Sequence, residues 1–376
     1  MAPAVSFEEE ARGLVFQRQG EIIPLHNPSE GRGLFANVLL HDNEVFVTYQ
    51  IAPFDSLMKD KNLYYRVYNR EAKELKGQTL AIDVTDENSM WGGDLGDQKF
   101  TIIDDVLYMV SLVMGTEKVR LMKFDLDFNA LENEVQIGDG ATEQFADMGM
   151  ANDGEFIYTQ FFYQGIGATS PDEWGAKMYK LDKRLNVVDS AVVFPETGSF
   201  VTGTSLTYVP KGQMGAQQNR FQIFSTNLDY GNTSRVGIHT FAIDANTLKL
   251  IPGSTQTIIE RDLDVYFPTG VSWNEKHQLW VVGYTQEIAE GVHTNENSGE
   301  LQEVGPSFIT LFDANWVELE TIQLNDGENA FRVMLQTEGD DIYAVYDEMD
   351  KNGLVRTSIA KMEHYKIAEQ VVSSTN

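Results

Sequence analysis

The sequence predicts an all-β fold made of repeated, four-stranded antiparallel sheets. Short alternating runs rich in Val, Ile, Tyr, Phe and Thr recur along the 376 residues, and clusters of Gly, Asn and Asp separate them. Helical periodicity is nearly absent. Two residue patterns repeat six times in the same order, as expected of a repeat architecture.

The first pattern is a Phe that begins a strand after a polar or Gly-rich loop. A turn rich in Gly, Asp or Asn follows it, and then a second, more aromatic strand, as in residues 41–44 before 45–49. Phe100 lies so near its turn at 104–105 that its strand is expected to begin further upstream. The six residues, 45 to 67 positions apart, are Phe35, Phe100, Phe145, Phe200, Phe267 and Phe331.

The second pattern ends each unit, where two apolar residues with one residue between them precede a short polar residue. An Asp or Asn at this position accepts a hydrogen bond from the backbone two residues on and so starts a turn. We therefore expect a hairpin between the last two strands of each unit. The polar residues are Asn69, Asp125, Asp182, Asp244, Asp313 and, in a weaker match, Glu363.

Together the patterns predict six four-stranded units that start near residues 35, 96, 145, 200, 267 and 331. One small sheet cannot bury both faces, whereas six sheets packed radially can, so the chain resembles a β-propeller in fold. Residues 13–26 contain two short strands, which we expect beside residues 365–372, closing the ring through both termini. A seventh blade is the alternative, and a pair of β-sandwiches is the structural rival.

The domain prediction is therefore a single propeller over residues 13–376, preceded by an extension of residues 1–12. Within the extension, Ser6 and Glu9 form a capping-box pattern that predicts one short helix. The first residues lack the basic and apolar regions of an export signal. We expect a mature periplasmic or extracellular protein, because a cysteine-free, acidic chain suits export, and a cytoplasmic location is the alternative.

Charge and cysteine content exclude several classes of function. The chain carries 57 Asp and Glu against 28 Lys and Arg, a net charge of −29, which opposes binding to nucleic acid or to an anionic membrane. Its apolar runs are too short to span a bilayer, so no membrane insertion is expected. The lack of Cys excludes disulfides and thiolate chemistry. The acidic surface favours a soluble monomer.

The longest loops mark the expected binding face. In a propeller, the innermost strands line a central channel, and the loops leading into them share a face with the loops between second and third strands, where ligands usually bind. Here that face carries residues 91–97, 163–176 and 285–306. Trp91, Tyr163 and Trp174 in these loops are candidates for stacking on a sugar ring. The alternative is that they only cover blade edges.

Three of the twelve arginines, Arg32, Arg261 and Arg332, lie just before or at the start of a channel strand. Arg holds a carboxylate or sulfate through two parallel hydrogen bonds, so three such groups would form an anion site. The alternative is that each pairs with a neighbouring acid, such as Glu30 or Glu328. Sialidase-like propellers use an arginine cluster in this way, but their Ser-x-Asp-x-Gly-x-Thr-Trp box is missing here, so the comparison is an analogy.

Acids near the channel mouth offer a second kind of chemistry. Asp94 and Asp147 are candidate ligand-binding residues, and Asp97, Glu143 and Asp264 lie nearby in sequence. Two carboxylates at the right separation serve as acid and base on a glycosidic bond. Since sequence does not give that separation, no catalytic residue is assigned.

No metal ligand is assigned and no cofactor is expected. Asp125–Asn129 starts like a calcium loop, but it lacks the Gly at position six and has Gln136 in place of the bidentate Glu, so we interpret it as a hairpin turn. Asp347 and Asp350 form a better oxygen cluster, which leaves Ca²⁺ as the one cation to test. The six His residues show no spacing typical of zinc.

The leading hypothesis is a propeller that binds a small polar, anionic or glycan ligand at its loop-rich mouth. One alternative is a glycoside hydrolase or polysaccharide lyase on the same scaffold, so enzymatic activity is left open. It requires a pair of carboxylates about 5–10 Å apart in a pocket. Another alternative is an interaction scaffold of the cell envelope or surface with a protein partner, which predicts an exposed apolar patch.

Overall fold

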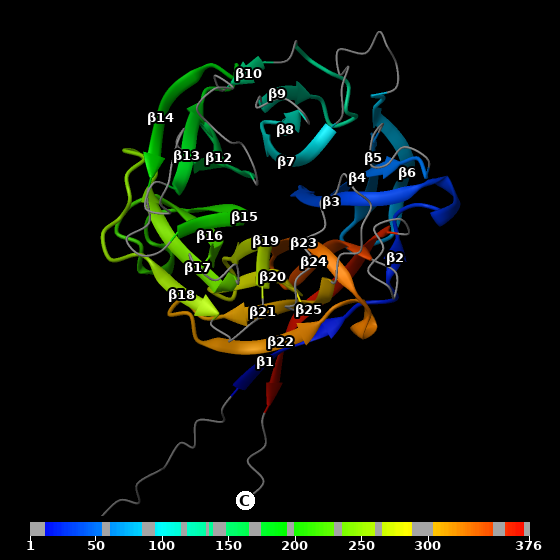
Figure 1. Ribbon diagram of the computed structural model, residues 1–376. Helices are drawn as coiled ribbons and strands as arrows, with labels where there is room; N and C mark the ends of the chain where they lie inside the picture. The colour runs from blue at the N-terminus through cyan, green and yellow to red at the C-terminus, as the bar shows by residue number, and fades with distance from the viewer. Residues whose placement is uncertain are drawn as a thin grey trace, which may run out of the picture.

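In the computed structural model the chain forms a six-bladed β-propeller (Figure 1), which confirms the six-blade prediction and makes the seven-blade alternative wrong. Each blade is an antiparallel sheet whose innermost strand faces the central channel, and each innermost strand contacts the next around the ring. The structure describes residues 12–54, 61–84, 95–113, 119–132, 135–137, 148–164, 174–193, 199–228, 235–259, 265–287, 304–348 and 358–371. The helix predicted at Ser6 to Glu9 lies outside these ranges.

The blades follow chain order, each running from its innermost to its outermost strand. Blade 1 comprises β3 (Arg32–His41), β4 (Glu44–Ala52), β5 (Asn62–Asn69) and β6 (Glu74–Ile82). Blade 2 comprises β7 (Leu95–Ile103), β8 (Val106–Val113), β9 (Val119–Phe124) and β10 (Val135–Ile137). Blade 3 comprises β11 (Met148–Asn152), β12 (Ile157–Gln164), β13 (Trp174–Leu181) and β14 (Val187–Val193).

The second half of the ring repeats this order. Blade 4 comprises β15 (Ser199–Val209), β16 (Arg220–Leu228), β17 (Arg235–Asp244) and β18 (Gln256–Ile259). Blade 5 comprises β19 (Val265–Asn274), β20 (Leu279–Glu287), β21 (Val304–Phe312) and β22 (Glu318–Gln323). Blade 6 comprises β23 (Ala330–Glu338), β24 (Asp341–Glu348) and β25 (Ile359–Val371), completed from the N-terminal segment. Short 3-10 turns are η1 (Pro28–Glu30), η3 (Gln213–Gly215) and η4 (Asn325–Gly327).

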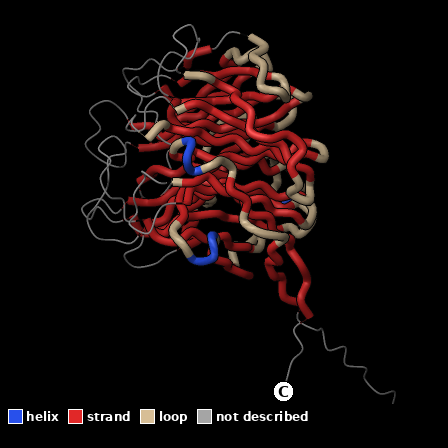
Figure 2. Tube along the Cα trace, turned by 90° about the vertical axis from the view of Figure 1, so that its right-hand side faces the viewer, coloured by secondary structure: helices blue, strands red, loops and turns tan. Residues whose placement is uncertain are grey.

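Both termini close the ring, as predicted. β1 (Arg12–Arg18) pairs antiparallel with β25 from Arg12 opposite Val371 to Arg18 opposite Tyr365. β2 (Ile23–Pro24) pairs with the earlier part of the same strand. The outer ends of β1 and β25 run side by side away from the ring in both views (Figures 1 and 2). The first and last described segments are therefore paired in one sheet.

The predicted polar residue starts a hairpin turn in five blades. The Asp182 carboxylate accepts hydrogen bonds from the backbone N–H groups of Arg184 and Asn186, at 2.8 and 2.9 Å. Asn69, Asp125, Asp244 and Asp313 accept equivalent bonds within their own turns. The prediction for Glu363 is wrong: it lies buried inside β25, which needs no turn there because blade 6 takes its outermost strand from β1.

The core is divided among the seams between neighbouring blades. One cluster joins Tyr65 of blade 1 to Leu107 of blade 2, and the other clusters likewise combine residues of adjacent blades. An apolar residue of an Asp-led turn enters these seams with positive φ, as Leu185 does at φ 64° and Phe128 at φ 62°. The turns thereby contribute to blade packing as well as to chain reversal.

Five of the six innermost strands carry a β-bulge or register irregularity within a few residues of their start. In β3 it lies between Leu34 and Asn37, and in β23 between Phe331 and Met334. The others interrupt β7, β15 and β19. Bulges re-aim side chains and are common beside binding sites. We call the end of the channel where these strands begin the mouth face, and the end with the β-hairpin and Asp-led turns the turn face. In Figure 2 the described turns of the turn face lie along the right-hand side.

Candidate functional site: the mouth of the channel

The middle of the channel is nearly filled by side chains. A cavity of only about 50 Å³ remains there, lined in part by Leu39, Phe100, Met148 and Leu335. This space is small beside ligand sites, which measure about 300–1,000 Å³. A wider cavity of about 250 Å³ lies toward the turn face. Among the described residues, the channel therefore narrows between the mouth and the turn face.

At the mouth, the bulge at Phe35 connects blade 1 to blade 6. Phe35 has φ 54° and is buried, and its backbone N–H donates to the Asp347 carboxylate at 3.0 Å. Ala36 N–H donates to the other oxygen of the same carboxylate at 3.4 Å. Positive φ is unfavourable for a residue with a side chain and persists only where surroundings enforce it. Asp347 supplies that enforcement, because it collects both N–H groups of the bulge.

Two cationic side chains lie against the Phe35 ring. The Arg332 guanidinium carbon is 4.0 Å from the ring centroid, and the Lys61 ammonium is 5.2 Å from it. Such contacts are attractive because the face of an aromatic ring is electron-rich. Arg332 itself has φ 56°, in the bulge of β23 that corresponds to the one in β3. Paired bulges thus bring cations of blades 1 and 6 to one aromatic ring.

A polar seam extends the cluster into blade 2. The Phe35 carbonyl accepts hydrogen bonds from the Asn37 amide at 3.0 Å and the Gln98 amide at 2.9 Å. Gln50 donates in turn to the Gln98 side-chain oxygen and to the Gly96 carbonyl at 2.8 Å. Buried amides that donate to one another in this way restrain their side chains, although the Gln50 side-chain oxygen itself accepts no hydrogen bond from the described residues. The start of β7 is therefore fixed relative to β3.

Blade 2 adds an ion pair and blade 1 an exposed ring. Lys99 lies 3.1 Å from the Asp97 carboxylate, with 12% of its side chain exposed. Arg32 is buried, and its guanidinium donates to the Phe54 carbonyl at 2.5 Å. Phe54, just beyond β4, is 50% exposed. The sequence analysis did not identify Phe54, Lys61 and Lys99 as site residues. No motif marks the two lysines, and Phe54 lies outside the repeat pattern.

The electrostatics of this mouth cluster oppose those of the whole chain. Among the described residues, four basic side chains (Arg32, Lys61, Lys99 and Arg332) lie at the mouth with two carboxylates, those of Asp97 and Asp347, whereas acids outnumber bases about twofold in the sequence. Burial raises the pKa of Asp347 to about 7, although the Arg332 charge and the two backbone N–H groups lower it. Counted over the described side chains alone, basic groups therefore exceed acidic ones at the mouth, a balance that favours an anion.

Only part of the predicted site can be placed. Arg32 is the first residue of β3 and Arg332 the third of β23, so both lie at the mouth face. The Arg32 guanidinium donates to the Phe54 carbonyl, and the Arg332 guanidinium lies on the Phe35 ring, with the Asp347 charge nearby. The backbones of Tyr163 and Trp174 belong to β12 and β13, at strand ends that also face the mouth. Trp91, Asp94, Asp147 and Arg261 lie outside the described residues, as do Glu143, Asp264 and Asp350.

The calcium candidates take different positions. Asp125 starts a hairpin turn, as interpreted from the sequence. Asp347 is 1% exposed, and its two oxygens accept hydrogen bonds from the backbone of blade 1. Its predicted partner Asp350 lies outside the described residues, so the expected oxygen cluster stays a prediction.

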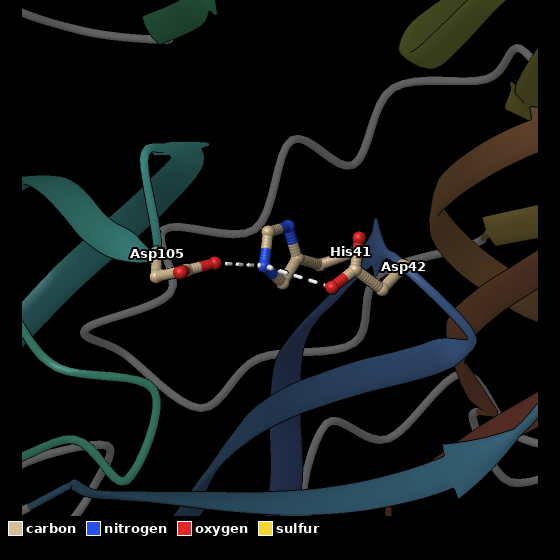
Figure 3. A group of neighbouring side chains, drawn as sticks. All are labelled: His41, Asp42 and Asp105. Carbon is tan, nitrogen blue, oxygen red and sulfur yellow. Dashed lines mark hydrogen bonds and ion pairs between the residues drawn. The ribbon is translucent and has the colours of Figure 1, made fainter.

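His41, Asp42 and Asp105 form a group on the turn face that could in principle hold a metal (Figure 3). His41 Nε2 is 2.8 Å from the Asp105 carboxylate and 3.9 Å from that of Asp42. Similar contacts join other neighbouring blades. His277 contacts Asp340 between blades 5 and 6, and Lys183 takes the place of the histidine in the contact with Asp104 between blades 3 and 2. The group in Figure 3 is therefore interpreted as a hydrogen-bonded contact between blades 1 and 2.

The large exposed apolar side chains of the described segments are spread over four blades. Outside the mouth they lie mainly on outermost strands and Asp-led turns: Leu75, Leu80, Leu131, Val187, Val188, Val317 and Leu319. This distribution gives little support to the scaffold alternative, which predicts one contiguous patch. Within the described residues, no helix is long and apolar enough to cross a membrane.

Comparison with known proteins supports the fold. No protein-family model matches the chain, and no curated protein matches its sequence. A neuraminidase-like protein of A/flat-faced bat/Peru has a TM-score of 0.55 at 12% identity, covering 97% of this chain and 96% of that chain. A neuraminidase-like protein of A/little yellow-shouldered bat/Guatemala has a TM-score of 0.52 at 9% identity, covering 96% and 100%. Similarity at these identities shows the propeller fold alone.

Proposed function

We propose that this propeller binds an acidic glycan, or a similar polar anion, at the mouth of its channel. The observation that carries the proposal is the mouth cluster, in which four basic side chains from three blades gather in a chain of net charge −29. Arg332 and Lys99 are both partly exposed and would contact the anionic groups. The exposed Phe54 ring would stack on a sugar face.

Two fold neighbours are named as neuraminidase-like, which makes glycans the first ligand class to test, although the likeness itself extends only to the fold. The cationic mouth narrows the choice to acidic glycans. We also propose a periplasmic or extracellular location, supported by the lack of cysteine and the acidic composition. Fractionation of the source cells, followed by immunoblotting, tests the location.

The binding test is a thermal-shift screen against three separate sugars, each with and without Ca²⁺. Two are acidic, a galacturonate trisaccharide and sialyllactose, and the third is neutral lactose. A ligand that binds only the folded state raises the unfolding midpoint by mass action. We expect shifts with the acidic sugars alone, and their loss in Arg332→Ala and Lys99→Gln. Arg70→Ala, which removes an arginine on the turn face that pairs with Glu338, should keep the shifts. The proposal would be contradicted by equal shifts of the unfolding midpoint in all variants, or by no shift with any acidic sugar.

A second candidate function is hydrolysis or elimination at a glycosidic bond. The observation that favours it is the pKa of Asp347, which at about 7 suits a general acid. Asp97 is the second carboxylate, and its charge contributes to that raised value. Release of reducing ends from acidic polysaccharides tests this activity. Product formation that disappears in both Asp347→Asn and Asp97→Asn would support it, whereas an inactive wild type would restrict the protein to binding.

A further inference from the structure

A pocket of about 370 Å³ lies between blades 4 and 5 on the turn face, away from the mouth. The start of β16 and the turn between β17 and β18 form one side, and the Asp-led turn of blade 5 forms the other. Its wall includes Met214, Arg220, Gln222, Ser254, Asn315 and Trp316. We call it the blade 4–5 pocket. Its volume falls in the range of small-molecule sites, about 300–1,000 Å³.

Arg220 in this pocket has no carboxylate partner among the described residues. Its Nε atom is buried and makes no hydrogen bond, and Nη2 contacts only the Met214 sulfur, at 3.7 Å. Sulfur is a weak acceptor, so the guanidinium is poorly satisfied. Burial lowers the pKa of Arg220, and no neighbouring charge offsets that effect.

An acid is close in the sheet, but it is engaged elsewhere. Asp244 is the residue directly opposite Arg220 in the pairing of β16 with β17. Its carboxylate accepts hydrogen bonds from the Gln218 amide and from the backbone N–H of Asn246. It starts the Asp-led turn of blade 4, and its oxygens are engaged in these bonds and make no ion pair with Arg220. The cation is thus left facing the pocket.

A half-buried arginine without a counter-ion is costly, and it is unexpected in a chain with 57 acids. An external oxyanion would satisfy it through the guanidinium fork. We propose that the blade 4–5 pocket binds a carboxylate- or sulfate-bearing molecule of about monosaccharide size, and that Arg220 holds its anionic group. The site is independent of the mouth proposed above, because the two lie at opposite faces of the ring.

The walls of the pocket are already fixed in place. The Trp316 ring stacks on Trp280 with centroids 5.3 Å apart and an angle of 12° between the planes. The Ser254 hydroxyl exchanges hydrogen bonds with the backbone of Ala242, and the Gln222 amide donates to Thr240. A site whose walls need little reordering loses little entropy on binding. Polar groups and an indole in one concave wall match a sugar-like ring that carries an anionic substituent.

The test is isothermal titration calorimetry with sodium glucuronate and with sodium sulfate, at ionic strength held constant with NaCl, and with glucose as the neutral control. We expect wild type to bind glucuronate, sulfate or both, and not glucose. Loss of the fork in Arg220→Lys should weaken binding about tenfold, and loss of the charge in Arg220→Met at least about a hundredfold. Arg184→Met, which removes an exposed arginine of the same face, should bind as wild type does.

The stability of the unliganded variants separates a binding role from a structural one. If Arg220 serves a ligand, Arg220→Met should unfold at the same temperature as wild type or above it, because an unpaired charge has been removed. A midpoint lowered by more than about 5 °C, or binding that survives in Arg220→Met, would overturn the proposal. So would the absence of any heat with both anions. Binding lost in Arg332→Ala but kept in Arg220→Met would assign the anion to the mouth and overturn the pocket.

Discussion

The buried carboxylate of Asp347 gives the sharpest prediction about stability. It is 1% exposed and accepts hydrogen bonds from the backbone N–H groups of Phe35 and Ala36. Burial raises its pKa from the ordinary 3.8 to about 7, against the opposing influence of Arg332. The perturbation is Asp347→Asn, which keeps one oxygen acceptor for the shorter bond, to Phe35, and removes the titration.

The sign follows from proton binding in the two states. Between pH 3.8 and 7 the unfolded chain releases the Asp347 proton while the folded chain keeps it, so the free energy of unfolding of the wild type falls as the pH rises. At about 1.4 kcal/mol per pH unit, this loss totals about 4 kcal/mol above pH 7. Between pH 5 and pH 8 the loss is about 3 kcal/mol, and Asp347→Asn escapes it.

The assay is urea unfolding followed by tryptophan fluorescence at pH 5, 6, 7 and 8, above the isoelectric point near 4.4. The difference between variant and wild type should move in favour of Asp347→Asn by about 3 kcal/mol from pH 5 to pH 8. Glu155→Gln, which removes an exposed carboxylate of blade 3, is the matched control variant. A flat difference for Asp347→Asn would refute the reasoning, because it would mean that Arg332 and the bulge keep Asp347 ionised throughout.

Two further predictions concern the repeat itself. Asp182→Ala removes the acceptor of two backbone N–H groups in the turn of blade 3, so it should lower the free energy of unfolding by about 1–2 kcal/mol in urea at pH 7. Hydrogen bonds from the Asn186 side chain and from backbone N–H groups of the turn lower the pKa of Asp182, so this contribution to stability should fade as the pH falls below about 4. A loss under about 0.3 kcal/mol at pH 7 would contradict the role of the turn. Gly270→Ala would place a Cβ atom 2.6 Å from backbone atoms of the neighbouring blade, so the thermal midpoint of this variant should drop by several degrees. In the control Gly77→Ala the nearest atom is 3.6 Å from the new Cβ atom, so this variant should unfold close to the wild-type temperature. Equal midpoints for the two alanine variants in calorimetry would show that the blades are not in close contact at Gly270.

The periodic features of the fold are visible in the sequence because each is encoded within a few residues. The Asp182 turn forms from hydrogen bonds two and four positions along the chain, so an Asp after an apolar pair is enough to predict it. Ring closure was also predictable, since β1 is a short alternating segment left over after six units are counted. Glu363 resembled a turn residue, but the source of the outermost strand of blade 6 decided its position, and a local pattern does not contain that information.

The charged sites were decided by the tertiary structure. Phe35 and Asp347 are 312 positions apart, and only the closed ring brings the bulge of blade 1 onto the carboxylate of blade 6. Lys61, Lys99 and Phe54 are ordinary residues in sequence until the blades gather them at one mouth. Arg220 shows the reverse effect: strand pairing places it opposite Asp244, yet the turn directs that carboxylate elsewhere. By itself, the sequence determined where the strands and turns lie, because short-range hydrogen bonds and burial fix them. Which charges find partners depends on contacts between distant segments, so the packed ring alone determined it.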